Sequence, residues 1–467
     1  MYGFYIDEDR RKARRAKWNT VRIISIGFFG VILLGSLLLW LPFSNHQPIR
    51  YIDALFTAVT CVCVTGLVTV VPAAQFTVAG KVILLILIQI GGLGIIACTT
   101  AFLILVGKRI NMKERVVIQE AYGLSTLQGM IRFIERVLWG TFLVEGIGAI
   151  GYSFQFIPEY GVAKGIFYSV FHSISAFCNA GVDILGDSSF TRYVNTPVIT
   201  ITTTMLVILS GLGYPVWIDL AKNIKMTIQS KGKRPVGRTI TRLSLQSKIV
   251  LTMTLFLLTL GTLGFYLLEH HNPATMGTLN AAGKFQAAFF QSVTTRTAGF
   301  ASISQSGLTN GSKLLASMLM IIGGSPAGTA GGIKTKIAVL LLTAISVLRG
   351  NKDTECYGRK ITFEIIRVGI TITLVTFVFW LFGVTVMTVI EPQQKVLDLM
   401  FEATSAMATV GLTADLTPVL SDISHVVLML MMYIGRIGPM TMALIFSGHV
   451  DKKNQFRTLP EAKIMVG

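Results

Sequence analysis

The sequence predicts an all-α integral membrane protein with four span–pore-loop–span repeats, in which eight transmembrane helices surround a central pseudo-fourfold pore. Two observations carry this prediction. The 467 residues are 52% hydrophobic and only 14% charged, whereas a soluble globular chain carries about 25% charged residues. In addition, a Phe ten residues before a Gly occurs four times, with the glycines 112 to 118 residues apart, and this indicates one unit used four times.

The four motif copies predict re-entrant pore helices. They join Phe56 to Gly66, Phe171 to Gly181, Phe289 to Gly299 and Phe401 to Gly411. A helix of roughly 12 residues spans about 18 Å, which is too short for a hydrocarbon core of about 30 Å. We therefore expect each helix to enter the membrane and turn back at its glycine. Helices lying on the outer surface are the alternative, but they would carry Lys or Arg faces, which these copies lack.

The net charge of +18 is placed as in a membrane protein rather than a nucleic-acid-binding one. Most of the 41 Lys and Arg residues gather in five clusters, at 10–22, 108–136, 222–248, 334–367 and 436–463. The positive-inside rule assigns such clusters to the cytoplasm. With an even number of spans, we expect a multi-pass protein of the plasma membrane with both termini cytoplasmic and no nucleic-acid partner.

The basic clusters divide the chain into repeats of one plan. The predicted divisions are a cytoplasmic tail at 1–19, repeat 1 at 20–110, repeat 2 at 130–225, repeat 3 at 246–350, repeat 4 at 362–450 and a cytoplasmic tail at 451–467. Most of the long apolar runs approach the ~20 residues of a spanning helix. The predicted spans are 20–42, 79–107, 134–157, 196–220, 246–269, 311–347, 365–390 and 422–447, and the pore helices are 53–65, 168–180, 286–298 and 398–410.

The residues that end each pore helix fit a cation selectivity filter. Rings of backbone carbonyls replace the hydration shell of K⁺ without adding full negative charges, and glycine permits the backbone angles that this requires. The predicted filter residues are Val64, Thr65, Gly66, Asn179, Ala180, Gly181, Thr297, Ala298, Gly299, Thr409, Val410 and Gly411. Each repeat lacks the second glycine of the TVGYG filter of tetrameric channels, so we expect fewer ion layers and weaker selectivity.

A glycine-rich segment interrupts the second span of repeat 3. Five glycines and a proline lie within 323–332, which is poor material for a continuous helix. We expect an intramembrane loop at 323–335 that acts as a gate below the filter, with a harmless kink as the alternative. The predicted gate residues are Gly323, Gly324, Ser325, Pro326, Ala327, Gly328, Thr329, Ala330, Gly331, Gly332, Lys334 and, in repeat 4, Arg436.

Several charged or polar residues in the predicted membrane region call for an interpretation. An arginine inside a span costs about 2.5–3.5 kcal/mol, so Arg436 is expected either to face the pore as an electrostatic barrier or to snorkel to the headgroups. Glu402 and Arg296 are candidates to pair behind the filter. Glu145 is interpreted as a packed structural carboxylate, with a proton relay as the alternative, and His172 as a hydrogen-bonded pore-helix residue.

These residues resemble the Trk/Ktr/HKT superfamily of K⁺ transporters, most closely the bacterial Ktr-type membrane subunit. The resemblance covers nearly all of the chain. It includes the four Phe…Gly copies, the run at 88–94 (IQIGGLG), the segment at 323–335 and the run at 435–439 (GRIGP). Eight spans rather than ten separate the chain from the Trk-type subunit.

The resemblance implies a function, a location and partners. It implies Na⁺-stimulated K⁺ uptake by a homodimer in the bacterial cell membrane, with one pore in each protomer. A cytoplasmic ring of nucleotide-binding RCK subunits is implied to open the gate, so ATP or ADP is expected on that ring and not on this chain, which needs no covalent cofactor. The carboxylate of Gly467 is implied to lie at the dimer interface. Gly66 favours K⁺, because family members with reduced K⁺ selectivity carry Ser at this position.

Two other classes of function compete with a gated pore. A secondary K⁺ symporter, coupled to Na⁺ or H⁺ and working by alternating access, predicts essential intramembrane carboxylates and slow, saturable flux. A membrane enzyme is disfavoured, because the sequence shows no Ser/His, paired-carboxylate or metal-ligand cluster. Its five cysteines also lack a paired CxxC spacing.

Overall fold

The computed structural model describes residues 24–106, 111, 115, 118–119, 122, 129–229, 241–325, 328–332, 334–351 and 353–438. Nearly every element in these residues is a helix, and a hairpin of β1 (Glu355–Cys356) and β2 (Arg359–Lys360) is the exception. The predicted tails at 1–19 and 451–467, with Gly467, lie outside the described residues. So do the predicted gate residues Pro326 and Ala327.

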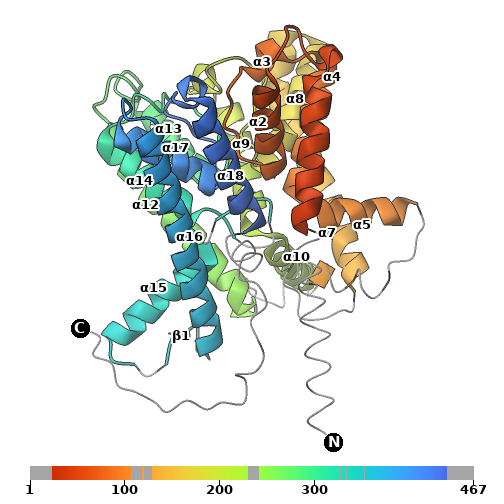
Figure 1. Ribbon diagram of the computed structural model, residues 1–467. Coiled ribbons are helices and arrows are strands. Elements are labelled where there is room, and N and C mark those ends of the chain that lie inside the picture. Colours follow the sequence, from red (N-terminus) through yellow and green to blue (C-terminus); the bar gives the residue numbers. More distant parts are fainter. Residues whose placement is uncertain are drawn as a thin grey trace, which may run out of the picture.

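Three helices recur four times in the same order: a first helix, a short helix and a second helix (Figure 1). We call each group of three a unit. Unit 1 is Ile24–Trp40, α2 (Tyr51–Cys63) and α4 (Val78–Leu93); unit 2 is α7 (Met130–Tyr160), α8 (Val162–Cys178) and α9 (Pro197–Leu212). Unit 3 is α12 (Leu245–Glu269), α13 (Ala281–Thr294) and α14 (Asn310–Ile322); unit 4 is α16 (Phe363–Ile390), α17 (Val396–Met407) and α18 (Asp422–Ile437). The connecting elements are η1 (Pro42–Ser44), α3 (Pro72–Gln75), α5 (Ile95–Leu105), η2 (Thr191–Tyr193), α10 (Tyr214–Gln229), α15 (Lys334–Leu348) and η3 (Thr417–Val419).

The short helices are buried, whereas the long helices expose apolar side chains. Phe56 on α2 and Phe401 on α17 are fully buried, while Trp139 on α7 and Phe382 on α16 are largely exposed. Extended apolar surface of this kind is typical of contact with lipid. Within the described residues, α7, α12 and α16 are long and apolar enough to cross a membrane, and so are the bent pairs α4 with α5 and α9 with α10. The number of eight spans stays a prediction.

The units form a closed ring in chain order. The second helix of each unit packs on the short helix of the next: α4 on α8, α9 on α13, α14 on α17 and α18 on α2. Ion pairs reinforce two of these junctions. Lys313 on α14 lies 2.6 Å from Asp398 on α17, and Arg50, just before α2, lies 3.2 Å from Asp422 on α18. The buried short helices therefore lie where neighbouring units meet.

Each second helix ends at a glycine with a positive φ. The four are Gly94 (84°), Gly213 (87°), Gly323 (57°) and Gly438 (100°). Beyond the first two, α5 runs at 101° to α4 and α10 runs at 98° to α9. The predicted spans at 79–107 and 196–220 are therefore each bent in the middle, because a residue with a positive φ cannot continue a right-handed helix. The break that the glycines predict in unit 3 is present, since α14 ends at Ile322 and α15 begins at Lys334.

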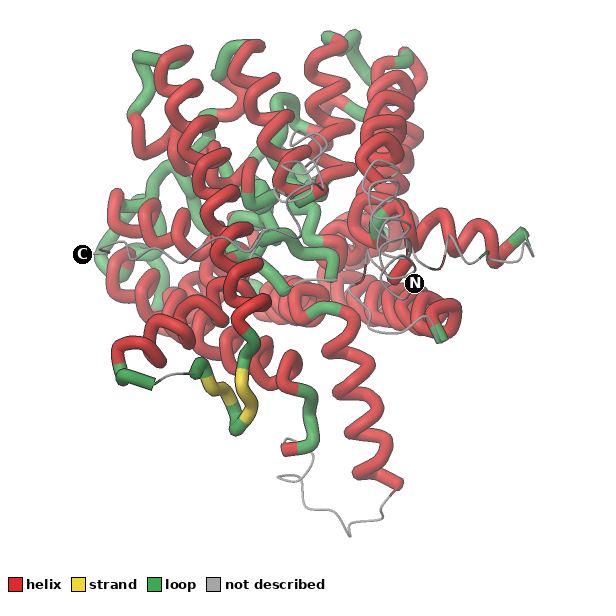
Figure 2. The backbone as a smooth tube through the Cα atoms, turned by 60° about the horizontal axis from the view of Figure 1, so that its bottom comes forward, coloured by secondary structure: helices red, strands yellow, loops and turns green. Residues whose placement is uncertain are grey.

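The β-hairpin follows α15 and packs against α12, and its two strands stand out in Figure 2. The Tyr357 hydroxyl in the hairpin turn lies 2.6 Å from Thr252 Oγ1 on α12, and Lys248 Nζ lies 5.5 Å from the centroid of the Tyr357 ring. The hairpin thus ties the end of α15 to unit 3.

Candidate functional site

Four glycines, one from each unit, meet at one place, and we call Gly66, Gly181, Gly299 and Gly411 the glycine ring. Their φ angles are 104°, 65°, 80° and 92°, which side chains rarely adopt. A Cβ added at Gly66 would lie 3.2 Å from Gly181 Cα, and one at Gly181 would lie 2.7 Å from Gly299 Cα. A Cβ at Gly411 would lie 2.8 Å from Gly66 Cα. Each unit therefore meets its neighbours here, and the fourth closes on the first.

Backbone carbonyls line the same ring. A Cβ at Gly66 would lie 2.6 Å from Ala180 O, one at Gly181 would lie 2.7 Å from Ala298 O, and one at Gly299 would lie 2.6 Å from Val410 O. Thr65 O faces Gly411 in the same way. The carbonyl that precedes each ring glycine thus faces a glycine of a neighbouring unit. Four oxygens gather at this point, and a side chain on a ring glycine would collide with them.

The residue two positions before each ring glycine is also left-handed. These residues are Val64 (φ 56°), Asn179 (59°), Thr297 (68°) and Thr409 (52°). A positive φ is an outlier for the β-branched residues Val and Thr, and strain of this kind collects at functional sites. Because the same strain recurs at the same position in four units, the twelve predicted filter residues share one backbone shape.

Hydroxyl groups on the short helices hold these strained segments. Thr60 Oγ1 accepts a hydrogen bond from Gly66 N and Ser405 Oγ accepts one from Gly411 N, both at 2.9 Å. Ser175 Oγ and Thr294 Oγ1 instead donate to carbonyls just after the ring, those of Val182 and Phe300, both at 2.6 Å. One hydroxyl in each short helix therefore fixes the chain around the ring glycine.

The positions of these hydroxyls show that the motif Phe of unit 3 is one residue later than predicted. Each follows a buried Phe by four residues, and in unit 3 that Phe is Phe290, which is 2% exposed, whereas Phe289 is only partly buried. The spacing from this Phe to the ring glycine is therefore nine residues in unit 3 and ten in the other units. The prediction that Phe289 occupies the position of Phe56 is wrong, because the ten-residue spacing selects Phe289, whereas burial and the Thr294 hydroxyl select the next residue.

The electrostatics of the glycine ring favour a cation. All four short helices direct their C-terminal ends toward it, and a helix C-terminus carries a partial negative charge. The twelve predicted filter residues include no charged side chain. Among the described residues, the buried hydroxyls of Thr65, Thr297 and Thr409 have no hydrogen-bond partner, and such groups need water or a cation to satisfy them. Oxygen atoms of this kind are suitable ligands for a cation.

The glycine-rich segment, residues 323–332, lies directly against this ring. Gly324 N donates to Gly331 O at 2.6 Å and Gly323 pairs with Gly332, so the segment folds back on itself. Thr329 Oγ1 donates to Phe177 O at 3.0 Å and accepts from Asn179 Nδ2 at 3.1 Å. A Cβ on Gly331 would overlap Thr409. The segment therefore touches the candidate filter in units 2 and 4.

Arg436 joins the glycine-rich segment to unit 1. Its Nη1 donates to Thr329 O at 2.6 Å, and its Nη2 donates to Gly91 O and, at 3.3 Å, to Gly92 O. Both glycines are closely packed, since a Cβ on Gly91 would overlap Val62 O and a Cβ on Gly92 would overlap Cys178. The guanidinium thus contacts protein backbone beneath the ring. Of the two placements expected from the sequence, in the protein interior or snorkelling to the headgroups, this is the interior one.

The predicted pairing of Glu402 with Arg296 is wrong. The Glu402 carboxylate accepts hydrogen bonds from Thr413 Oγ1 at 2.5 Å, Ala414 N at 2.9 Å and Thr417 Oγ1 at 2.7 Å. Arg296 is 6% exposed, and its guanidinium nitrogens have no hydrogen-bond partner among the described residues. The Glu402 carboxylate is therefore satisfied within its own unit and does not pair with Arg296.

Glu145 and His172 are both buried in unit 2. Gln89 Nε2 donates to Glu145 Oε1 at 3.1 Å, so this carboxylate is hydrogen-bonded to α4. His172 Nδ1 lies 2.7 Å from Tyr168 O. A carbonyl only accepts, so Nδ1 carries the proton and Nε2 is left to accept from Ile184 N at 3.5 Å.

One acidic residue next to the ring was not predicted from the sequence motif. Asp183, two residues after Gly181, accepts a hydrogen bond from Leu185 N at 3.2 Å. Burial raises the pKa of its carboxyl to about 6, although hydrogen bonds from the surrounding loop lower it. A carboxyl at this position in a single unit carries no periodic signal, so the fourfold motif does not reveal it.

A ring of apolar helices of this kind fits an α-helical membrane transporter. Comparison with known proteins agrees, since residues 6–457 match the family described as TrkH, cation transport protein. The chain therefore belongs to the TrkH family of cation transport proteins, which confirms the resemblance to Trk and Ktr proteins.

Relatives match along the whole chain. The chain is 36% identical to the Ktr system potassium uptake protein B of Bacillus subtilis (strain 168), over 98% of this chain and 99% of that protein. It is 35% identical to the potassium/sodium uptake protein NtpJ of Enterococcus hirae, over 98% and 99% respectively. The fold resembles the crystal structure of the potassium transporter TrkH from Vibrio parahaemolyticus, with a TM-score of 0.69 at 17% identity over 91% of this chain and 85% of that one.

Proposed function

We propose that this chain takes up K⁺ through a gated, channel-like pore whose selectivity filter is the glycine ring. The observation that carries the proposal is the closed cycle of ring glycines with the carbonyls of Thr65, Ala180, Ala298 and Val410. Carbonyl oxygens of this kind replace the hydration shell of K⁺. Two relatives named Ktr system potassium uptake protein B support K⁺ as the cargo. In this proposal the four units are repeats that together supply eight spans.

The gate in this proposal is the glycine-rich segment with Arg436. The segment contacts Asn179 and Thr409 of the candidate filter, so it closes the path directly beneath the glycine ring. Arg436 holds it there through Thr329 O and places a positive charge beside the path. Opening requires the segment to leave Asn179 and Arg436, and glycine gives it the backbone freedom to do so.

Regulation in this proposal comes from outside the chain. Relatives named as proteins B and D of a Ktr system support a system with more than one component. We propose a homodimer with Gly467 at its interface, a cytoplasmic RCK ring that carries the nucleotide, and Na⁺ as an activator. NtpJ, named as a potassium/sodium uptake protein, supports a link to Na⁺.

Tracer flux into liposomes tests this function. A channel-like pore predicts that purified protein takes up radioactive Rb⁺ when an outward K⁺ gradient supplies the only driving force, with Na⁺ equal on both sides and pH clamped. Uptake that requires a Na⁺ or H⁺ gradient would overturn the channel reading and favour the symporter. Empty liposomes and liposomes containing the Gly66→Ser variant are the controls.

A further inference from the structure

The residue after the buried Phe of each short helix is polar in all four units. These residues are Thr57, His172, Gln291 and Glu402, and they are at most 1% exposed. In units 2, 3 and 4 this side chain reaches the segment that follows the ring glycine. His172 Nε2 accepts from Ile184 N at 3.5 Å, and Gln291 exchanges two hydrogen bonds with Gln305, at 2.7 and 3.0 Å.

Glu402 makes the largest number of these contacts. Its Oε1 accepts from Thr413 Oγ1 and Ala414 N, and its Oε2 accepts from Thr417 Oγ1. The three donors begin two residues after Gly411, so the carboxylate ties α17 to the chain that leaves the ring. Thr417 O is in turn held by His425 Nε2 on α18 at 2.8 Å. The backbone of Thr409–Gly411 is also held to α17, since Thr409 N donates to Ala406 O at 3.1 Å and Gly411 N donates to Ser405 Oγ.

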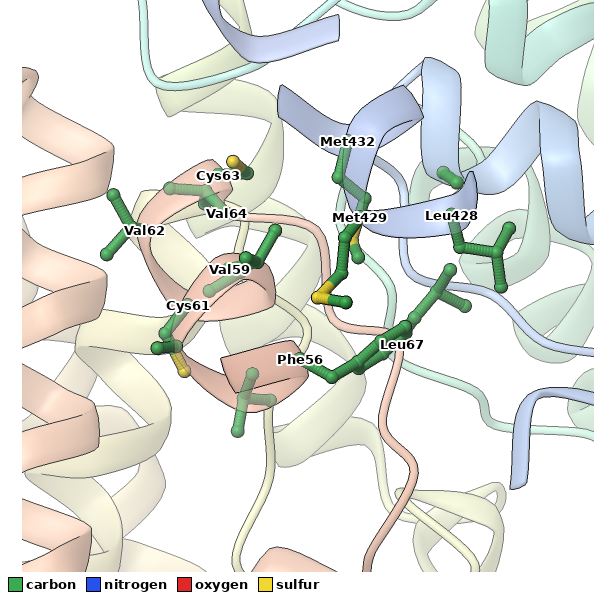
Figure 3. Packing of buried hydrophobic residues seen from close by; sticks show 14 of the residues in the cluster. Phe56, Val59, Cys61, Val62, Cys63, Val64, Leu67, Leu428, Met429 and Met432 are labelled. Atoms are coloured by element: carbon green, nitrogen blue, oxygen red, sulfur yellow. The ribbon is translucent and has the colours of Figure 1, made fainter. Parts of the chain in front are cut away.

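Among the described residues, unit 1 shows no polar contact of this kind. Thr57 Oγ1 donates to Asp53 O within α2, at 2.7 Å, and does not reach the segment after Gly66. That segment is held by apolar packing instead, because Leu67 lies with Phe56, Leu428 and Met429 in one buried cluster between α2 and α18 (Figure 3). The corresponding position in unit 1 therefore provides a natural control.

We infer that Glu402 is a positioning residue for K⁺ selectivity, which keeps the carbonyls of unit 4 at the distance that the glycine ring requires. This inference rests on the proposed function of the ring. The carboxylate acts through hydrogen bonds to residues 413–417 and not by contact with the ion. A filter discriminates K⁺ from Na⁺ only while its carbonyls stay in place, and unit 4 depends on one side chain for three of its hydrogen bonds.

Two substitutions at Glu402 separate positioning from charge. Glu402→Leu removes every acceptor and leaves buried donors unsatisfied, so we expect the K⁺/Na⁺ permeability ratio to fall about tenfold or more. Glu402→Gln removes the charge but keeps the contacts: its Oε1 accepts from Thr413 and Ala414, and its Nε2 donates to Thr417, whose hydroxyl also accepts. We expect this variant to stay within about threefold of the native ratio.

Matched variants complete the test, which measures Rb⁺ flux with Na⁺ competition in liposomes. Thr417→Val keeps the side-chain volume and removes one donor, so a fall of about threefold is expected, and the effect should be absent in the Glu402→Leu background. Thr57→Val in unit 1 should leave the ratio unchanged. Monodispersity and thermal stability in detergent show that each variant is folded.

The outcomes distinguish this inference from the function on which it rests. If Gly66→Ser lowers selectivity while folded Glu402→Leu and Thr417→Val keep the native ratio, the positioning role is wrong and the filter stands. If Glu402→Gln loses selectivity as fully as Glu402→Leu, the charge and not the hydrogen bonds is responsible, which also overturns the inference. If Gly66→Ser has no effect, the filter itself is misassigned.

Discussion

Replacing Gly66 with Ser lowers the K⁺/Na⁺ permeability ratio by about tenfold or more, since a misplacement that costs about 1.4 kcal/mol changes an equilibrium tenfold. The backbone at Gly66 has a φ of 104°, which a side chain resists, and a Cβ there would lie 2.6 Å from Ala180 O. The collision pushes a filter carbonyl of the neighbouring unit away from the ring. Competition between Rb⁺ and Na⁺ in liposome uptake measures the change.

Gly161→Ser is the matched control for this variant. Gly161 has a φ of 80°, so a side chain there meets a similar backbone strain, but a Cβ there meets no atom within 4 Å and the residue lies just before α8, away from the ring. Its permeability ratio should equal the native one. Equal ratios for native protein and Gly66→Ser would remove Gly66 from the filter.

Arg436→Ala raises basal Rb⁺ flux in the absence of any regulatory partner. The guanidinium donates to Thr329 O in the glycine-rich segment and to the carbonyls of Gly91 and Gly92 in unit 1. A hydrogen bond from a charged group contributes about 1.5–3 kcal/mol, so freeing the segment should increase the open fraction at least tenfold while the closed state predominates. Initial rates of tracer uptake at matched protein density measure the effect.

Arg436→Lys separates the tether from the charge. An ammonium keeps the positive charge, but it lacks the planar fork that reaches Thr329 and Gly91 together. If the tether closes the gate, the lysine variant has a flux well above the native level; if the charge alone limits passage, its flux stays native. A flux at or below the native level in well-folded Arg436→Ala would show that neither role applies.

The fourfold plan was predictable because the Phe…Gly motif recurs at a nearly constant spacing along the sequence. A motif that recurs every 112 to 118 residues locates the short helices, and composition shows that they lie within an apolar protein. The family match supports this class of fold. The close approach of Gly66, Gly181, Gly299 and Gly411 also follows the motif, since glycine was required where four backbones meet.

The helix bends were not predictable in the same way. Each glycine inside a helix costs only about 1 kcal/mol, so the glycines at 91, 92 and 94 and those at 211 and 213 weaken two apolar runs without showing where they bend. The five glycines of the segment in unit 3 are dense enough to predict a break in the helix. The positive φ at Gly94 and Gly213 is a property of the folded backbone, and a local sequence pattern does not contain it.

The directions of side chains were also not predictable from the motif. The motif places Glu402 and Arg296 on short helices of adjacent units, but it does not say which face of each helix looks toward the neighbour. Glu402 turns toward Thr413 and Thr417 of its own unit instead. The shift from Phe289 to Phe290 has a similar cause, because the spacing favours Phe289 and only the fold shows that Phe290 is the buried one.

The most direct test of the filter is the position of a heavy K⁺ analogue in a crystal. Tl⁺ replaces K⁺ at carbonyl sites and scatters X-rays anomalously. The proposed function predicts a Tl⁺ peak on the axis of the glycine ring, coordinated by the carbonyls of Thr65, Ala180, Ala298 and Val410, and predicts that excess K⁺ abolishes it. A strongest intramembrane Tl⁺ peak away from these four carbonyls, for example beside Glu145, would contradict it.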